Sequence, residues 1–356
     1  MDYMLSLNVQ CPLELLEVCP SYKQTPLLEI SPLNNIRLFV KDETNRMGLG
    51  SFKALGGIYA VAKFLLEQWQ EENGSQLPVQ RLTDPQVRSW SNKFTFVCAS
   101  AGNHGIAVAK GAELFNANCR VHIAHSVPAS FSEKLTTLGA AVIRSGETYE
   151  ESMVAAMNDN SKGEVLLADS SWPGYYHLPM LVMEGYTVIA EEMRQVFLRA
   201  DNWPTHVFLQ AGVGGLAASM AFEIRKNWKQ QPRIIVVEPN AAPCLFESHK
   251  LGRATSVSGP ISSMGRLDCK EPSLIAFKLL KELADDFVCV SDEDALAAAD
   301  FLAQNNLATT ASGAAGLAAI LSNAKLDIAI PDNSICLVIA TEGSIYANEF
   351  SGSKLD

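Results

Sequence analysis

Short apolar runs alternate along the chain with longer segments in which apolar residues recur every three or four positions. The short runs predict buried strands, and the longer segments predict amphipathic helices. Strands are expected at 36–42, 94–100, 119–125, 140–146, 164–169, 206–211, 234–239 and 335–341. Helices are expected at 52–73, 105–115, 131–139, 148–159, 181–198, 216–228, 273–285, 292–304 and 313–322.

This alternation predicts an α/β fold in which mostly parallel sheets are covered by helices on both faces. Three similar strand–helix units between about residues 94 and 165 predict a compact subdomain with its own small sheet. The segment 74–86, which is rich in Gln and Pro, is expected to be a surface connection.

Composition and charge favour a globular protein and argue against a nucleic-acid-binding or membrane-binding one. The chain has 356 residues, of which 48% are hydrophobic and 19% charged, so it can bury a sizeable core. Its net charge of -11 argues against nucleic acid or an anionic membrane as the main partner, because both attract basic surfaces. The eight cysteines have no zinc-ligand spacing, which predicts free thiols and no metal site. Without a signal peptide or an apolar run of about 20 residues, a cytoplasmic protein is expected.

Lys53 is the only charged residue in the segment GSFKALGG at 50–57. Desolvation disfavours the ammonium form, so these surroundings predict a lowered pKa and a neutral amine that can attack an aldehyde. The alternative is a lysine at a helix start whose ammonium group reaches water. Taken alone, the segment favours this second interpretation.

The loop SAGNHG at 100–105 follows a predicted strand and opens a predicted helix, so its backbone N–H groups can bind an anion. Ser100, Asn103 and His104 add polar side chains, and together they suit a carboxylate or a phenolate oxygen. A tight strand-to-helix turn explains the same residues equally well.

The segment AGVGGLAA at 211–218 also lies between a strand and a helix, and its glycines allow close approach of a phosphate to the backbone. Gly212, Gly214 and Ala217 also match a dinucleotide fingerprint, with Glu238 at the end of the next strand. This segment by itself therefore predicts either a phosphate cradle or an NAD site.

Two further strand ends carry polar side chains. Asp169 ends a strand before SSWPGYY, where it can act as a base or simply cap a turn. Thr341 ends the last strand and can offer a hydroxyl to a ring nitrogen, or be a plain strand end. The acidic pairs at 71–72, 191–192 and 285–286 are expected to be solvated.

Taken together, the segments resemble the fold type II pyridoxal-phosphate (PLP) enzymes, the tryptophan synthase β-like group, and within it the diaminopropionate ammonia-lyases. The resemblance spans roughly residues 24 to 346 and rests on FVKDETNRMGLGSFKALGG, SAGNHG, ADSSWPGY, VMEGYTVIAEE, AGVGG, VVEPNAAPCL and IATEGS. It implies a two-domain homodimer in which each domain is a mostly parallel twisted sheet covered by helices. Residues 1–62 and 190–356 would form the large cofactor-binding domain, and 63–189 a smaller, mobile domain that closes on the substrate.

The resemblance also implies roles for individual residues. Lys53 would hold PLP as a Schiff base, and Asp169 would accept the α-proton of an L-amino acid. The cofactor would be bound by Asn103 at its phenolic oxygen, by Gly212, Val213, Gly214 and Gly215 at its phosphate, and by Thr341 at its pyridine nitrogen. The substrate carboxylate would be bound by Ser100, Ala101, Gly102 and His104.

Ala101 departs from the family pattern, because the family normally has an aspartate there that is linked to turnover of the D-isomer. The expected activity is therefore β-elimination of a small amino acid, with L-2,3-diaminopropionate favoured, to give a 2-oxo acid and ammonia. The alternatives are a serine/threonine dehydratase or a β-replacement synthase of the same fold, an NAD-dependent oxidoreductase, and a cofactor-binding protein without activity.

Overall fold

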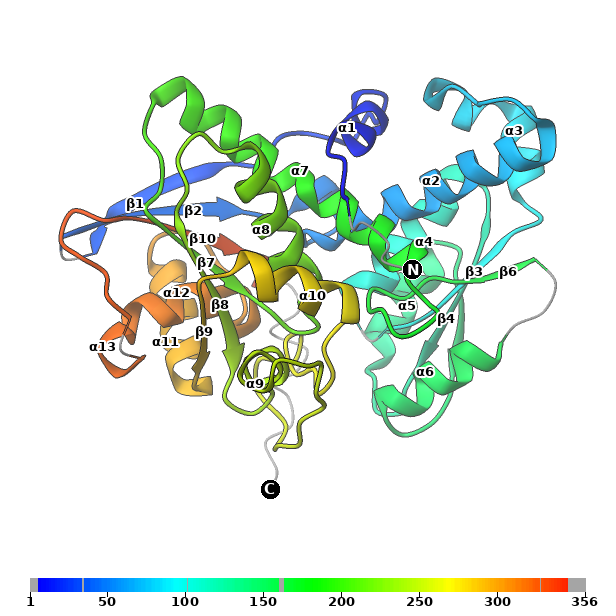
Figure 1. Ribbon diagram of the computed structural model, residues 1–356. Helices are drawn as coiled ribbons and strands as arrows, with labels where there is room; N and C mark the ends of the chain where they lie inside the picture. The colour runs from blue at the N-terminus through cyan, green and yellow to red at the C-terminus, as the bar shows by residue number, and fades with distance from the viewer. Residues whose placement is uncertain (1–5, 34, 101, 160–162, 327, 345–356) are drawn as a thin grey trace.

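Two sheets joined by helices form the framework of the computed structural model, which describes residues 6–33, 35–100, 102–159, 163–326 and 328–344 (Figure 1). The large sheet has the strand order β1 (Leu27–Leu33), β2 (Ile36–Asp42), β10 (Ile335–Ala340), β7 (His206–Gln210), β8 (Arg233–Pro239), β9 (Asp286–Val290). The small sheet has the order β5 (Ala141–Arg144), β4 (Asn118–Ile123), β3 (Thr95–Ala99), β6 (Glu164–Leu166). Neighbouring strands are parallel except β1 and β2, so the predicted mostly parallel α/β fold is confirmed.

Helices cover the sheets and connect them. Those before the small sheet's last strand are α1 (Gln10–Glu17), α2 (Lys53–Asn73), α3 (Pro85–Ser91), α4 (Asn103–Phe115), α5 (Ala129–Thr137) and α6 (Tyr149–Asn158). Those after it are α7 (His177–Ala200), α8 (Gly215–Asn227), α9 (Cys244–Leu251), α10 (Leu274–Leu283), α11 (Asp292–Gln304), α12 (Ala311–Leu321) and α13 (Asn323–Leu326). Across the described ranges, none of the helices has the length and apolar character that crossing a bilayer requires.

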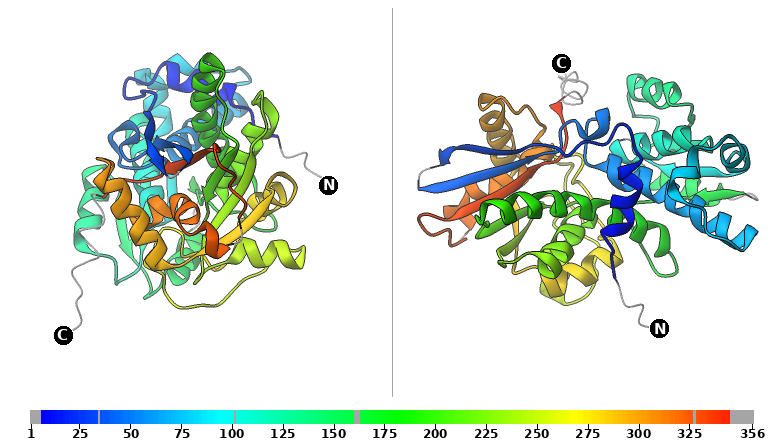
Figure 2. Two further views of the ribbon diagram at one scale, coloured as in Figure 1. Left: turned by 90° about the vertical axis from the view of Figure 1, so that its left-hand side faces the viewer. Right: turned by 90° about the horizontal axis from the view of Figure 1, so that it is seen from above.

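The large sheet is buried on both faces, as its continuous apolar runs predict. On β7 and β8, Val207, Leu209 and Val236 belong to one core cluster, which contains residues of α7, α8 and α10. Phe208 and Ile235 point the other way, into a second cluster with residues of α11 and α12. Figure 2 shows these helices on opposite sides of the sheet.

Helix α2 lies between the two sheets, in contact with α4 on one side and α7 on the other (Figure 1). Glycines make this contact close: a Cβ added at Gly57 would lie 2.5 Å from the Cβ of Ala107, and one at Gly56 would lie 2.5 Å from the carbonyl oxygen of Val182. The glycines after Lys53 are therefore explained by helix packing. The predicted domain boundaries at 62/63 and 189/190 fall inside α2 and α7, and the division itself stays a prediction.

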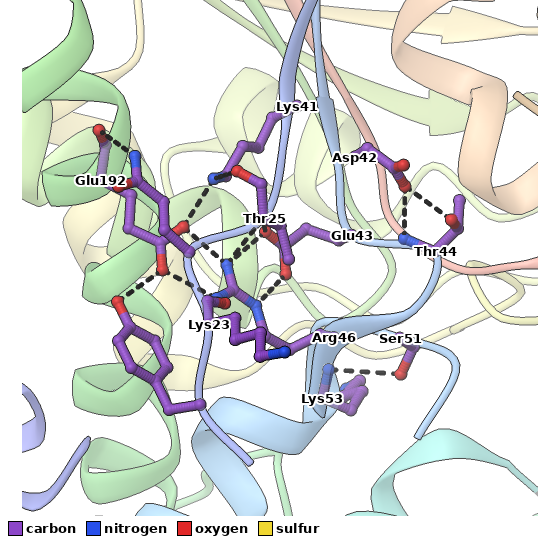
Figure 3. A network of polar contacts seen from close by, with 12 residues as sticks. Lys23, Thr25, Lys41, Asp42, Glu43, Thr44, Arg46, Ser51, Lys53 and Glu192 are labelled. Carbon is purple, nitrogen blue, oxygen red and sulfur yellow. Dashed lines mark hydrogen bonds and ion pairs between the residues drawn. The ribbon is translucent and has the colours of Figure 1, made fainter. Parts of the chain in front are cut away.

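A buried cluster of four charged residues ties the chain segment before Lys53 to α7 (Figure 3). The Arg46 guanidinium donates to both carboxylate oxygens of Glu192, at 2.7 and 2.8 Å, and also to Glu43. The Lys41 ammonium donates to Glu192 as well. Burial raises the pKa of Glu192, but Arg46 and Lys41 outweigh it, so the pKa is lowered overall. The predicted solvation of the acidic pair at 191–192 is therefore wrong, because both carboxylates lie on the packed face of α7.

Replacing Glu192 by glutamine is expected to reduce the free energy of unfolding by about 3–5 kcal/mol, because it leaves two buried cations without their shared counter-charge. Chemical denaturation of the cofactor-free protein measures this. The matched control is Glu29→Gln, which removes an exposed ion pair with Arg37 and should cost less than about 1 kcal/mol. Equal losses in the two variants would show that the buried cluster does not stabilise the fold.

Candidate active site

The turn that leads into Lys53 is hydrogen-bonded to the end of the last strand, β10. Lys53 is the first residue of α2, and its backbone N–H donates to the Ser51 hydroxyl at 3.3 Å (Figure 3). The Phe52 N–H donates to the carbonyl of Thr341 at 3.1 Å, just after β10. Because β2 and β10 are parallel neighbours, their carboxyl ends meet at the same edge of the sheet. This places Lys53 and Thr341 at the same edge, as open α/β sheets place their ligand sites.

Lys53 and Asp169 form an ion pair that joins the two sheets. Asp169 follows β6 of the small sheet, whereas Lys53 follows β2 of the large sheet. The side chains are 22% and 17% exposed, so a small molecule can still reach the pair. The structure thus brings together the two residues that the sequence singled out for proton transfer and covalent chemistry.

The protonation states of the pair differ from the sequence-based expectation. Burial works to lower the pKa of Lys53, but the Asp169 carboxylate outweighs it and the pKa is raised. Burial works to raise the pKa of Asp169, but the Lys53 ammonium outweighs it and the pKa is well below its usual range. The expectation of a neutral Lys53 amine is therefore wrong for the protein without a bound cofactor, because the Asp169 carboxylate lies against the amine and favours its charged form.

The Tyr186 side chain of α7 lies beside Lys53. Its ring centroid lies 5.8 Å from the Lys53 ammonium nitrogen, and a Cβ added at Gly56 would lie 2.4 Å from the ring. Its hydroxyl is buried and finds no partner within the described chain. Burial raises the pKa of this phenol, which therefore keeps its proton.

The loop 100–105 reaches the site from β3 and the start of α4. The Ser100 hydroxyl accepts hydrogen bonds from the N–H groups of Gly102 at 3.1 Å and Gly105 at 3.0 Å, so it shapes the loop. His104 lies at 2.8 Å, through Nε2, from the carbonyl of Leu167, two residues before Asp169. Burial lowers the pKa of His104, which makes the imidazole a neutral donor to that carbonyl. Ala101, the fourth residue predicted to bind substrate here, lies outside the described residues.

A buried carboxylate that the sequence analysis did not identify connects this loop to the last strand. The Asn103 amide donates to Glu342, which follows Thr341. Glu342 also accepts from the Thr310 hydroxyl at 2.6 Å and lies 3.7 Å from Nε of Arg266. The only sequence signal for Glu342 was its place in IATEGS beside Thr341.

The glycine turn at 212–215 connects β7 to the N-terminus of α8. Gly214 has φ of 99°, a left-handed conformation that glycine adopts without strain. A Cβ added at Gly212 would lie 2.9 Å from the Cys269 sulfur, and the Ser273 N–H fixes the turn through the carbonyl of Val213 at 2.9 Å. The turn presents backbone N–H groups at a helix N-terminus, which is the arrangement that binds phosphate.

Glu238, the acidic residue of the dinucleotide fingerprint, accepts hydrogen bonds from the protein's own backbone. Glu238 at the end of β8 accepts from the N–H groups of Leu245 at 2.8 Å and Phe246 at 2.6 Å, in the first turn of α9. Burial raises its pKa to about 8. A carboxyl group whose two oxygens both accept backbone hydrogen bonds is not free to bind a ribose, which argues against the NAD interpretation of the segment 206–239. Among the described residues, no group of three His, Cys, Asp or Glu side chains has the arrangement of a metal site.

Comparisons with known proteins point the same way as this geometry. A family model described as "Pyridoxal-phosphate dependent enzyme" matches residues 18–342. The chain is 33% identical over 298 residues to the diaminopropionate ammonia-lyase of Salmonella typhimurium, covering 79% of this chain and 73% of that protein. It is 29% identical over 345 residues to the diaminopropionate ammonia-lyase of Escherichia coli, covering 90% and 85%. The crystal structure of the Escherichia coli enzyme with an aminoacrylate-PLP azomethine reaction intermediate matches with a TM-score of 0.82 and 27% identity, over 96% of this chain and 90% of that chain.

Proposed function

The chain belongs to the family of pyridoxal-phosphate dependent enzymes, and on this premise we propose that it is an ammonia-lyase that removes the β-substituent of a small amino acid. The first candidate substrate is L-2,3-diaminopropionate, with a 2-oxo acid and ammonia as products. The observation that carries the proposal is the ion pair of Lys53 and Asp169, which places an amine and a carboxylate together at the carboxyl end of the large sheet. The similarity to enzymes named diaminopropionate ammonia-lyase supports the choice of substrate.

The residues present fit pyridoxal phosphate. The turn at 212–215 presents backbone N–H groups at the N-terminus of α8, and Gly214 in it has φ of 99°, which glycine adopts without strain. The Oδ1 atom of Asn103 is buried and finds no partner in the part of the chain that the structure describes. Lys53 supplies the amine that the cofactor's aldehyde requires. We therefore assign the aldehyde carbon to Lys53, the phosphate to Gly212, Val213, Gly214 and Gly215, the phenolic oxygen to Asn103 and the pyridine nitrogen to Thr341.

When bound, pyridoxal phosphate supplies an electron sink for negative charge at the substrate's α-carbon. The chain supplies position and proton transfer. The Lys53 ammonium lowers the pKa of Asp169, so this residue carries a carboxylate, and we assign that carboxylate to accept the α-proton of an L-amino acid. Lys53 would hold the cofactor through Nζ, and once the substrate's amine has displaced it, Nζ could carry a proton beside Asp169 and deliver that proton to the departing amine. We assign the loop 100–105 to the substrate carboxylate.

The best second candidate is a serine/threonine dehydratase of the same fold. The observation that favours this candidate is Ala101, which stands where the diaminopropionate ammonia-lyases normally carry an aspartate. The methyl group of alanine cannot abstract a proton. A β-replacement synthase would use the same amine and carboxylate with a second substrate.

The test is a substrate panel with purified holoenzyme, measuring release of 2-oxo acid from L- and D-2,3-diaminopropionate, L- and D-serine, and L-threonine. The proposal expects the highest kcat/KM with L-2,3-diaminopropionate. Higher kcat/KM with serine or threonine would establish the dehydratase instead. Release of no 2-oxo acid from any of them would overturn the ammonia-lyase assignment.

The variant Ala101→Asp is expected to raise the D:L ratio of diaminopropionate turnover about tenfold or more, because it restores the carboxylate that the family normally has here and that is linked to turnover of the D-isomer. The ratio of kcat/KM for the two isomers measures this. The matched control is Ala101→Asn, which has nearly the same shape but cannot act as a base. An unchanged ratio in the aspartate variant would contradict our account of this position.

We also propose that the protein is a cytoplasmic homodimer. The support for the compartment is that each of the eight cysteines is a free thiol, which suits reducing conditions. The support for the dimer is the family resemblance alone. Light scattering of the purified protein tests the dimer, and fractionation of the source cells tests the compartment.

A further inference from the structure

The side-chain amide of Gln210 lies at the end of β7, beside the end of the neighbouring strand β10. Its Nε2 atom donates to the carbonyl of Gly313 at 2.9 Å and to the carbonyl of Ile339 at 2.8 Å. An amide oxygen in the same place would face two carbonyl oxygens, so these contacts fix which end of the amide points toward β10. Gln210 is 2% exposed, so water does not compete for its hydrogen bonds.

The same amide nitrogen faces the hydroxyl of Thr341, which follows β10. The distance from Nε2 of Gln210 to Oγ1 of Thr341 is 3.4 Å. An amide nitrogen donates and does not accept, so the hydroxyl oxygen is the acceptor in this contact. The hydroxyl's own hydrogen finds no acceptor in the part of the chain that the structure describes, and Thr341 is buried. This hydrogen is therefore left for a bound molecule.

The surroundings hold both groups in this arrangement. A Cβ added at Gly316 of α12 would lie 3.0 Å from Oε1 of Gln210, so α12 packs directly against the amide oxygen. The Thr341 carbonyl accepts from the N–H of Phe52 at 3.1 Å, one residue before Lys53. The hydroxyl of Thr341 is thus carried by a backbone that is tied to the lysine turn, and its orientation is set by the amide.

We propose that Gln210 is a positioning residue that fixes the Thr341 hydroxyl as a hydrogen-bond donor to the pyridine nitrogen of the cofactor. The proposal rests on the proposed function, because it takes Thr341 as the partner of that nitrogen. A ring nitrogen that accepts this hydrogen bond carries no proton, so the cofactor is a weaker electron sink than it would be with a protonated nitrogen. Gln210 acts only through Thr341.

The test measures the Kd of the cofactor-free protein for pyridoxal phosphate and for its deaza analogue, in which C–H replaces the ring nitrogen. The analogue keeps the aldehyde, the phenolic oxygen and the phosphate, so the ratio of the two Kd values isolates the contact at the nitrogen. The wild type is expected to bind the analogue about 3- to 10-fold more weakly, the effect of one hydrogen bond. In Gln210→Met, two carbonyls lose their donor and the Thr341 hydroxyl can turn to one of them, so the ratio should fall close to one.

Variants of Thr341 show whether Gln210 acts through this hydroxyl. Thr341→Val should bring the ratio close to one, whereas Thr341→Ser keeps the hydroxyl and should keep the ratio. Adding Gln210→Met to Thr341→Val should then change the ratio no further. If Gln210→Met does not fold, Gln210→Glu gives the same test at nearly the same size, because its carboxylate accepts the hydrogen of the Thr341 hydroxyl and the ratio should again fall.

The matched control is Gln231→Met. The Gln231 amide also donates to two backbone carbonyls, of Ile224 at 3.1 Å and Trp228 at 2.9 Å, but it is exposed and lies just before β8, at the end of the strands away from the site. It should leave the ratio unchanged.

A wild-type ratio of one would overturn the proposal. A wild-type ratio in Gln210→Met would also overturn it, even if both compounds bound more weakly, because Gln210 would then only support the fold. A failure of the ammonia-lyase assignment would differ from both: the ratios would change as predicted, but the substrate panel would release no 2-oxo acid.

Discussion

Replacing Lys53 by alanine is expected to reduce turnover of every amino acid below about one thousandth of the wild-type rate and to abolish the visible absorption of the bound cofactor. The variant loses the amine that holds the cofactor's aldehyde and also a proton-transfer group, and the proton transfer alone is worth about 10²–10⁴-fold. Both effects are measured on one preparation, by 2-oxo acid release and by the absorption spectrum after adding pyridoxal phosphate.

The matched control for this variant is Lys63→Ala, because Lys63 is on the same helix α2 but pairs with Glu67 away from the site. It should retain the absorption and most of the activity. A Lys53→Ala protein that kept wild-type activity and absorption would show that the cofactor is held elsewhere.

The variant Asp169→Asn is expected to lower kcat for the L-isomer about 10²–10⁴-fold, because an amide of the same shape cannot accept the α-proton. Asp286→Asn, at a surface ion pair with Arg233, serves as the control. If Asp169→Asn kept wild-type kcat, Lys53 alone would have to be the base.

The same variant also changes how stability depends on pH. The folded-state pKa of Asp169 is lowered, so its stabilising contribution is present above the unfolded value of about 3.9 and is lost as the pH falls through the folded value. The pKa of Lys53 is raised, so its contribution is present below about 10.4 and is lost as the pH rises further. The Tm difference between the cofactor-free wild type and Asp169→Asn should therefore be largest between about pH 5 and 9. A difference that grows on acidification would contradict this ion pair.

The main strands and helices could be predicted from the sequence because each has a clear apolar period. All the predicted strands and helices are present; those at 36–42 and 292–304 have the predicted ends, and the others have shifted ends. The additional elements α1, β1, α3, α9, β9 and α13 have weak local signals. For example, β1 is an antiparallel edge strand that contains Pro32, and β9 begins at Asp286, which the sequence pattern placed at a helix end. The connection predicted at 74–86 ends at Pro85, which begins α3.

The candidate site was only partly predictable, because its electrostatics depend on residues far apart in the chain. Lys53 and Asp169 were each identified from the sequence, but not as a pair, because they are 116 residues apart in the chain. Their ion pair raises the pKa of the lysine, whereas the sequence predicted a lowered pKa. Arg266 lies in none of the segments that the sequence analysis singled out, and Tyr186 was part of VMEGYTVIAEE without a role of its own. Only the fold places them beside Gly102 and Lys53. Gly56 and Gly57 were interpreted with the lysine, whereas the packing of α2 explains them.

The central claim is that pyridoxal phosphate is joined to the amine of Lys53, and reduction with borohydride tests it most directly. The holoenzyme is reduced, digested and mapped by mass spectrometry. We predict the reduced cofactor on the peptide that contains Lys53, with no adduct on a peptide that contains only other lysines. A cofactor adduct on any other residue, or no adduct at all in a protein that turns over amino acids, would contradict the account.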